Sequence, residues 1–175
     1  MVGKRKTGDK LGDIRRATIV EVVQRGSSAA SVNDIAKRAG LAVGTIYRYY
    51  KNKEQLLRAV QMSIKTDLHE HVMAAAQSER DAKAKVRAMW FSILHYAHAN
   101  PDSFLFSEVI LNSDLLVDAE RDLIHAMLLE GMQIVEDAIQ DGTGLRHDMR
   151  AVRTILIAPA LHLGRATARA GEFPE

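Results

Sequence analysis

The chain has 175 residues, 47% of them hydrophobic and 26% charged, with a formal net charge of +2 and no cysteine. This length can bury a core, and the lack of cysteine excludes disulfide frameworks, thiolate nucleophiles and cysteine metal sites. No apolar run approaches the roughly 20 residues of a membrane span, and the opening MVGKRKTGDK lacks the apolar stretch of a secretory signal. We therefore expect a soluble, cytoplasmic protein with no membrane partner.

The small net charge conceals an uneven distribution of charged residues. Residues 1–60 hold 13 Lys and Arg against 5 Asp and Glu, whereas residues 61–175 hold 11 against 17. A basic N-terminal third beside an acidic remainder is typical of a polyanion-binding module joined to a separate body. Chance scatter of charge over a solvated surface is the alternative interpretation of this pattern.

The residue pattern predicts helices nearly throughout, because apolar residues recur at three- and four-residue steps. Residues 1–10 form a basic tail that we expect to be mobile. A first helix runs over about 13–25 and ends at a Gly-Ser-Ser turn. The second begins with a capping box in which Ser31 precedes Asp34 by three residues, and Gly40 supplies the turn that follows.

The pattern beyond this turn predicts a third short helix over 43–50. A fourth is capped by Asn52 and continues to about residue 76. Asn100-Pro101 ends a later helix, since the residue before proline avoids the α region, and Pro159 predicts a kink in the last one. The remaining helices are predicted over about 81–99, 102–112, 114–140 and 148–170.

The segment 31–57, SVNDIAKRAGLAVGTIYRYYKNKEQLL, predicts two short helices joined by a tight turn with glycine, which is a helix-turn-helix unit. Ala36 is small where the two helices must approach, and Ile46 packs the second helix on the first. In such a unit the second helix enters the major groove of DNA by its N-terminal end.

This segment resembles the DNA-binding domain of TetR-family transcriptional regulators. The shared residues are D-I-A at 34–36, A-G at 39–40, G-T-I-Y at 44–47, the aromatic residues Tyr49 and Tyr50, and K-N-K-E-x-L-L at 51–57. The sequence departs from the family at Ala42, where a serine commonly caps the recognition helix. A looser resemblance covers the rest of the chain, whose last two long helices form the dimer interface in that family.

The resemblance implies an all-α fold with two domains. Residues 1–51 would form a three-helix helix-turn-helix domain, joined by a long helix to a helical effector-binding and dimerisation bundle over 52–175. It also implies a bacterial, homodimeric repressor that binds double-stranded DNA at a palindromic operator and is released by a small, largely apolar effector. The alternative is a helical ligand- or partner-binding protein with only non-specific nucleic-acid binding.

Side-chain chemistry assigns expected roles at the DNA. Thr45 and Arg48 are candidates for base-edge contacts, while the tyrosines and lysines beside them would reach phosphates. The N-terminus of the second helix could donate N–H groups to another phosphate, and Lys4, Arg5 and Lys6 could enter a minor groove. Tyr50 is expected to face the core. The candidate DNA-binding residues are Ser31, Val32, Lys37, Val43, Gly44, Thr45, Tyr47, Arg48, Tyr49, Lys51 and Lys53.

The two long C-terminal helices carry two apolar stripes each, which predicts burial against the body on one side and a partner on the other. A centrally buried helix of a monomer is the alternative. The predicted dimer interface comprises Leu128, Val135, Ile157, Leu161 and Gly164.

Aromatic and methionine side chains in the body could line an apolar effector pocket with histidines as polar anchors, although a packed core is the plainer interpretation. The predicted pocket residues are Met89, Trp90, Phe91, His95, Phe104, Met127 and His162. His95 and His98 have metal-ligand spacing, but nothing completes a site, so we expect no metal and no cofactor. Because no nucleophile elbow, phosphate loop or metalloprotease motif occurs, we expect no enzymatic activity.

Overall fold

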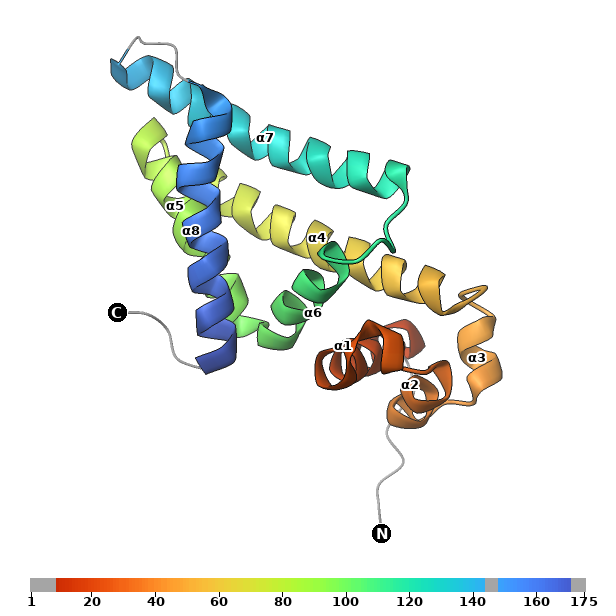
Figure 1. The fold of residues 1–175 in the computed structure, drawn as a ribbon. Coiled ribbons are helices and arrows are strands. Elements are labelled where there is room, and N and C mark those ends of the chain that lie inside the picture. The colour runs from red at the N-terminus through yellow and green to blue at the C-terminus, as the bar shows by residue number, and fades with distance from the viewer. Residues whose placement is uncertain (1–8, 144–147, 171–175) are drawn as a thin grey trace.

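The computed structural model describes residues 9–143 and 148–170, and within these ranges it contains helices and no strand (Figure 1). This confirms the predicted all-α fold class. The helices are α1 (Lys10–Ala29), α2 (Val32–Ala39), α3 (Val43–Tyr47), α4 (Lys53–Gln77), α5 (Ala82–Ala99), α6 (Pro101–Leu111), α7 (Asp118–Thr143) and α8 (Met149–Ala170). None of the helices so described has the length and apolarity that a membrane crossing requires.

The helix caps in the N-terminal third follow the sequence signals. Ser31 accepts a hydrogen bond from the N–H of Asp34 and so starts α2, and Asn52 accepts one from Gln55 at the start of α4. Gly40 ends α2 with φ 69°, a left-handed conformation that glycine adopts without steric cost.

Helices α1, α3 and α7 differ from their predicted bounds, and α7 runs over Asp118–Thr143 instead of 114–140. Helix α1 reaches Ala29 instead of residue 25. Gly26, at φ 82°, interrupts the regular helix, and the chain then makes one more turn, which is closed by a hydrogen bond from the Ala30 N–H to the Gly26 carbonyl. Helix α3 ends at Tyr47 instead of residue 50, where the N–H of Tyr49 bonds the carbonyl three residues earlier, at Ile46. Such three-residue bonds tighten the end of a helix.

Helices α1 to α3 gather at one end of the molecule, and α4 leads from them into the body (Figure 1). There α4 packs against α5, α6 and α7, while α8 packs mainly on α5 and α6. Helix α1 contacts α2, α4 and α6, so it touches both the N-terminal unit and the body.

The larger apolar core continues from the N-terminal unit into the body without a break. Ile14 of α1, Ile46 of α3 and Leu57 of α4 are each at most 1% exposed, and they belong to one cluster with Phe106 and Ile110 of α6. The proposed domain boundary between residues 51 and 52 falls at the turn before α4, but the buried side chains cross it. A second, smaller cluster in the body contains Tyr96, Ala97, Phe104 and Ala168.

Candidate DNA-binding surface and ligand cavity

Helix α3 is anchored by one buried residue, and exposed side chains lie at its end and in the turn after it. Ile46 is 1% exposed, whereas the side chains of Tyr47 and Tyr49 are 52% and 47% exposed. Arg48 and Lys51 are exposed on the same segment. Helix α3 and the turn that follows it therefore present two phenols, a guanidinium and an ammonium to the outside.

The start of α3 lacks a side-chain cap. Ala42 occupies the cap position and makes no side-chain hydrogen bond, as expected from the departure of the sequence from the family at this residue. The turn is instead held by backbone bonds, from the Leu41 N–H to the Ala36 carbonyl at 2.9 Å and from the Thr45 N–H to the Ala42 carbonyl at 2.8 Å.

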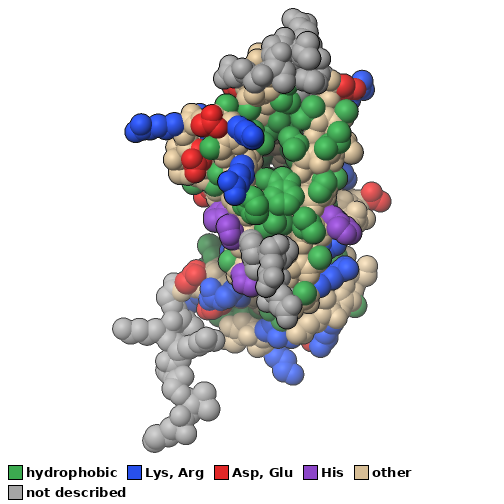
Figure 2. Space-filling view, turned by 90° about the vertical axis from the view of Figure 1, so that its left-hand side faces the viewer, with side chains coloured by type: hydrophobic (Ala, Val, Ile, Leu, Met, Phe, Trp, Pro, Cys, Tyr) green, Lys and Arg blue, Asp and Glu red, His purple; other side chains and the backbone are tan. Residues whose placement is uncertain are grey.

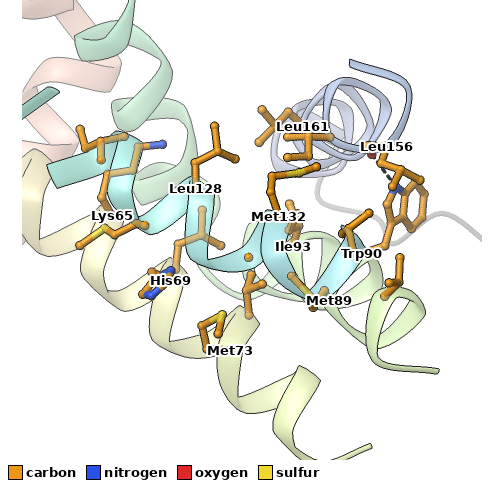
Figure 3. Close-up of a pocket in the computed structure, with 18 of the residues that line it drawn as sticks. Lys65, His69, Met73, Met89, Trp90, Ile93, Leu128, Met132, Leu156 and Leu161 are labelled. Atoms are coloured by element: carbon orange, nitrogen blue, oxygen red, sulfur yellow. Dashed lines mark hydrogen bonds between the residues drawn. The ribbon is translucent and has the colours of Figure 1, made fainter. Parts of the chain in front are cut away.

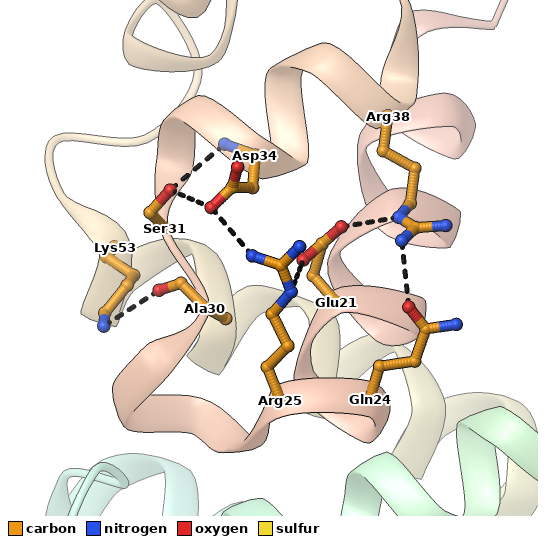
Figure 4. A network of polar contacts seen from close by, with 8 residues as sticks. All are labelled: Glu21, Gln24, Arg25, Ala30, Ser31, Asp34, Arg38 and Lys53. Carbon is orange, nitrogen blue, oxygen red and sulfur yellow. Dashed lines mark hydrogen bonds and ion pairs between the residues drawn. The ribbon is translucent and has the colours of Figure 1, made fainter.

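A polar network fixes α2 against α1 (Figure 4). Glu21 of α1, only 3% exposed, accepts a hydrogen bond of 2.7 Å from Arg38 Nε and forms an ion pair with Arg25 at 3.3 Å. Arg25 also reaches Asp34, and Arg38 donates to Gln24. Because a buried carboxylate must be paired to be stable, this network holds the helix-turn-helix unit in one arrangement.

Lys53, at the start of α4, binds the end of α1. Its Nζ donates to the carbonyls of Ser27, Ser28 and Ala30, each at 3.1 Å. These carbonyls lie where α1 ends and would otherwise lack partners in the helix. The lysine therefore connects the first and fourth helices across the turn.

The structure separates the predicted DNA-binding residues into exposed and internal ones. Val32 is 8% exposed and belongs to the core, because it lies on the apolar stripe of α2. Ser31 and Lys53 are half-buried and serve as cap and clamp, and Val43 and Thr45 are half-buried as well. The exposed members are Lys37, Gly44, Tyr47, Arg48, Tyr49 and Lys51.

Two further expectations concern the edges of this surface. Tyr50 packs against the core, and burial, with a smaller contribution from Tyr49, raises the pKa of its phenol. Lys4, Arg5 and Lys6, expected in a minor groove as part of the mobile tail, lie outside the described residues.

The body contains an apolar cavity of about 350 Å³ between α4, α5, α7 and α8 (Figure 3). Its volume is in the range of small-molecule sites. Four of the chain's seven methionines line it, and this flexible, polarisable side chain adapts to irregular ligand shapes. The indole N–H of Trp90 in its wall donates to the Leu156 carbonyl at 3.0 Å.

Three of the predicted pocket residues, Met89, Trp90 and Met127, line this cavity. Phe104 instead packs in the smaller core, and His95 and His162 lie exposed outside the cavity. Phe91 follows Trp90 on α5 and therefore points about 100° away from it. It is 39% exposed, and its ring meets the Trp90 ring edge-on at 5.4 Å between centroids.

The predicted dimer residues face the interior of the protomer. Leu128, Val135, Ile157 and Leu161 line the cavity, and Gly164 lies under Phe104, where a Cβ would come within 2.9 Å of the ring. The apolar stripe of each helix that was predicted to form the dimer interface therefore faces the inside of the bundle. The exposed apolar residues of these helices are Leu123, Leu129, Ile155 and Leu163, with exposed fractions of 50%, 53%, 70% and 36%.

Sequence reasoning missed the two polar residues of the cavity, Lys65 and His69. They lie one turn apart on α4, and Figure 3 shows them on the side of the cavity opposite Trp90 and Leu156. Burial lowers the pKa of Lys65 to about 8, and the negative charge of Glu108 opposes this shift. A lysine between Ile64 and Leu68, in a helix expected to pack inside the protein, was the available signal.

His69 faces a carboxylate, since its Nε2 lies 2.9 Å from Glu130 Oε2. Within the described part of the chain no three His, Asp or Glu side chains come together as a metal site would require.

Residues 14–60, which contain the helix-turn-helix unit, match the family model described as bacterial regulatory proteins, tetR family. The N-terminal unit of this chain is therefore a DNA-binding domain of the TetR type. This confirms the resemblance inferred from the sequence, and TetR-family proteins are DNA-binding transcriptional regulators rather than enzymes.

Individual TetR-family proteins share the fold and part of the sequence. YvdT of Bacillus subtilis strain 168, an uncharacterised HTH-type transcriptional regulator, is 30% identical over 77 residues, which are 44% of this chain and 40% of YvdT. A regulator from Marinobacter aquaeolei VT8 superposes with a TM-score of 0.83 at 24% identity, covering 95% of this chain and 87% of that one. FadR from Bacillus subtilis, solved in complex with stearoyl-CoA, superposes at 0.74 with 22% identity, covering 91% and 88%. The chain spans about half the length of the curated relatives that it matches.

Proposed function

We propose that this chain is a homodimeric repressor that binds a palindromic operator and leaves it when a small, largely apolar effector occupies the cavity. The observation that carries the proposal is the exposed side of α3, where Arg48 and Lys51 make no ion pair with other described residues. As a regulator that binds DNA, it would act in the cytoplasm.

The exposed side chains on this surface, and the half-buried Thr45, have roles that their chemistry supports. Arg48 can hydrogen bond a guanine edge with both ends of its guanidinium, and Thr45 can contact a thymine methyl. Tyr47, Tyr49 and Lys51 would bind phosphates and so fix the position of α3 in the major groove. Lys37, exposed on α2, would add sequence-independent attraction.

The outer faces of α7 and α8 support a homodimer. Leu129 and Ile155 leave more than half of their side-chain surface exposed, and such apolar patches commonly mark interfaces. Figure 2 shows the side of the molecule with α5 and α8, where hydrophobic side chains gather between charged groups at either end. A two-fold axis at the outer faces of α7 and α8 would repeat the DNA-binding surface, and the operator would then be palindromic.

Helix α4 supplies a physical connection between the cavity and the DNA. It begins at the Lys53 clamp beside the helix-turn-helix unit and passes the cavity at Lys65 and His69. A ligand that prefers one position of α4 would bias the spacing of the two α3 helices in a dimer. The complex of FadR with stearoyl-CoA supports a ligand site in a bundle of this fold.

The experiment that tests the proposal is selection of random duplex DNA by the purified protein at near-physiological salt. We expect a palindrome with a fixed half-site spacing of about one helical turn or a multiple of it. Recovery of no common sequence, with binding that disappears as salt rises, would instead favour a helical protein with only non-specific affinity for nucleic acid.

A further inference from the structure

One cationic side chain lines a cavity that is otherwise apolar. Of the described residues around it, Lys65 and His69 carry ionisable groups, and the only other polar N–H of a side chain, that of Trp90, is already bonded to a carbonyl. The remaining lining is aliphatic or methionine. An ammonium in such surroundings is costly unless something compensates its charge.

No group of the described chain makes a direct ion pair or hydrogen bond with the Lys65 ammonium, and Glu108 compensates its charge only in part and from a distance. No acceptor lies within hydrogen-bond distance of its Nζ, and no carboxylate lies within 4 Å among these residues. The carboxylate whose charge acts on Lys65 is that of Glu108 on α6, and it already forms an ion pair with Arg165, whose Nε lies 2.6 Å away. His69, the other ionisable group, is paired with Glu130. Lys65 is thus the one cation in the cavity wall that is available to a ligand.

We propose that the effector is a single-chain amphiphile with a carboxylate head group, held by the Lys65 ammonium while its hydrocarbon tail fills the cavity toward Trp90. This inference rests on the proposed function and names its effector class. One ammonium offsets one negative charge, which favours a carboxylate over a dianionic phosphate. The hydrogen bond between opposite charges would be strengthened by the apolar lining of the cavity.

The dimensions of the cavity agree with a chain of medium length. A volume of about 350 Å³ lies near the lower end of the range of small-molecule sites, which runs from roughly 300 to 1,000 Å³. A linear saturated chain such as that of decanoate therefore suits it as a probe. The four methionines, on α4, α5 and α7, can adjust to the tail.

Trp90 provides a built-in reporter for the test, since it is the only tryptophan of the chain and lies in the cavity wall. The full-length protein is titrated with decanoate, 1-decanol and decyltrimethylammonium while Trp90 emission is recorded, and calorimetry gives the affinities independently. We expect decanoate to bind about tenfold more tightly than decanol, which is the gain of a charged hydrogen bond. The cationic amphiphile should bind most weakly.

Variants assign the preference to one side chain. Lys65→Met keeps the length of the side chain and should reduce decanoate affinity about tenfold while decanol affinity changes less than about twofold. Lys65→Arg should retain the preference. Lys83→Met on the exposed face of α5 is the matched control and should change neither affinity. If Lys65→Met does not fold, the comparison of the three probes on the unaltered chain still decides whether the cavity prefers a carboxylate head group.

The outcomes separate this inference from the proposed function. Equal affinities for decanoate and decanol would overturn the carboxylate head group and leave an apolar effector site standing. Binding of none of the probes would overturn the carboxylate amphiphile together with the effector site, whereas operator recognition is judged by the DNA selection alone.

Discussion

At the proposed DNA-binding surface, single residues would determine which contacts carry sequence information. Arg48 and Lys51 are both exposed cations on or beside α3, but their chemistry differs: a guanidinium matches a base edge, and an ammonium acts as a point charge toward phosphate. Lys53 is also cationic and close in sequence, but its ammonium donates hydrogen bonds to three carbonyls at the end of α1. Sequence alone could not distinguish these three, because their roles depend on what lies across the turn.

Replacing the two exposed cations should give two different results. Arg48→Ala is expected to cost about 1–3 kcal/mol on the selected operator and to relax specificity at one base position. Lys51→Ala should weaken binding to all sequences about equally and lower the salt slope by about one. Affinities for the operator and its single-base variants at several salt concentrations measure both effects. Identical losses on every DNA would contradict base recognition by Arg48.

The charge of Lys65 should make ligand binding depend on pH. Its pKa is lowered to about 8 by burial, against the opposing charge of Glu108, so the ammonium that binds a carboxylate is lost as pH rises through that value. Decanoate remains ionised throughout, and we expect its affinity to fall between about pH 7 and about pH 9.5. His69 and Glu130 are the other ionisable groups beside the cavity. Decanol, titrated in parallel, should show no such fall, and neither should decanoate with Lys65→Met.

At the scale of helices, periodicity predicted the elements but not the direction of each face. The caps at Ser31 and Asn52 are encoded locally, and both formed as the sequence indicated. One apolar stripe on α7 and one on α8 were predicted to meet a partner. Leu128 and Ile157, which belong to these stripes, line the cavity. Periodicity shows that one face of a helix is apolar. It cannot show whether that face lines a cavity or contacts a partner chain, because an apolar face suits both.

The outer faces of α7 and α8 can be tested by adding a charge. Ile155 is 70% exposed, so Ile155→Glu costs little in the monomer but places a carboxylate in the proposed interface. We expect a shift from dimer to monomer in sedimentation velocity at micromolar concentration, with a loss of operator affinity. Val109→Glu, at an exposed apolar residue of α6, is the control. If both variants sediment like the unaltered chain, this face is not the interface.

At the scale of the whole molecule, the cavity and the DNA-binding surface are connected through α4 and a shared core. If decanoate shifts the molecule away from DNA, linkage requires operator DNA to weaken decanoate binding by the same factor. We expect a factor between about 5 and about 150, the usual range of coupling. Operator titrations with and without saturating decanoate give one factor, and Trp90 titrations with and without operator give the other. Decanoate that binds without changing operator affinity would contradict its role as effector.

The uninterrupted core has a consequence for cooperativity. Ile14, Ile46, Leu57 and Phe106 belong to one apolar cluster, and Lys53 ties α4 to the end of α1. The first three helices therefore bury their apolar faces partly on α4 and α6, and cutting the chain near residue 51 would expose those faces to water. In hydrogen exchange, the amides of α1 and of the first half of α4 should open together as one foldon. We therefore expect that the helix-turn-helix of this chain cannot be detached as a module, and that grafting it onto another body would require transplanting α4 and α6 with it.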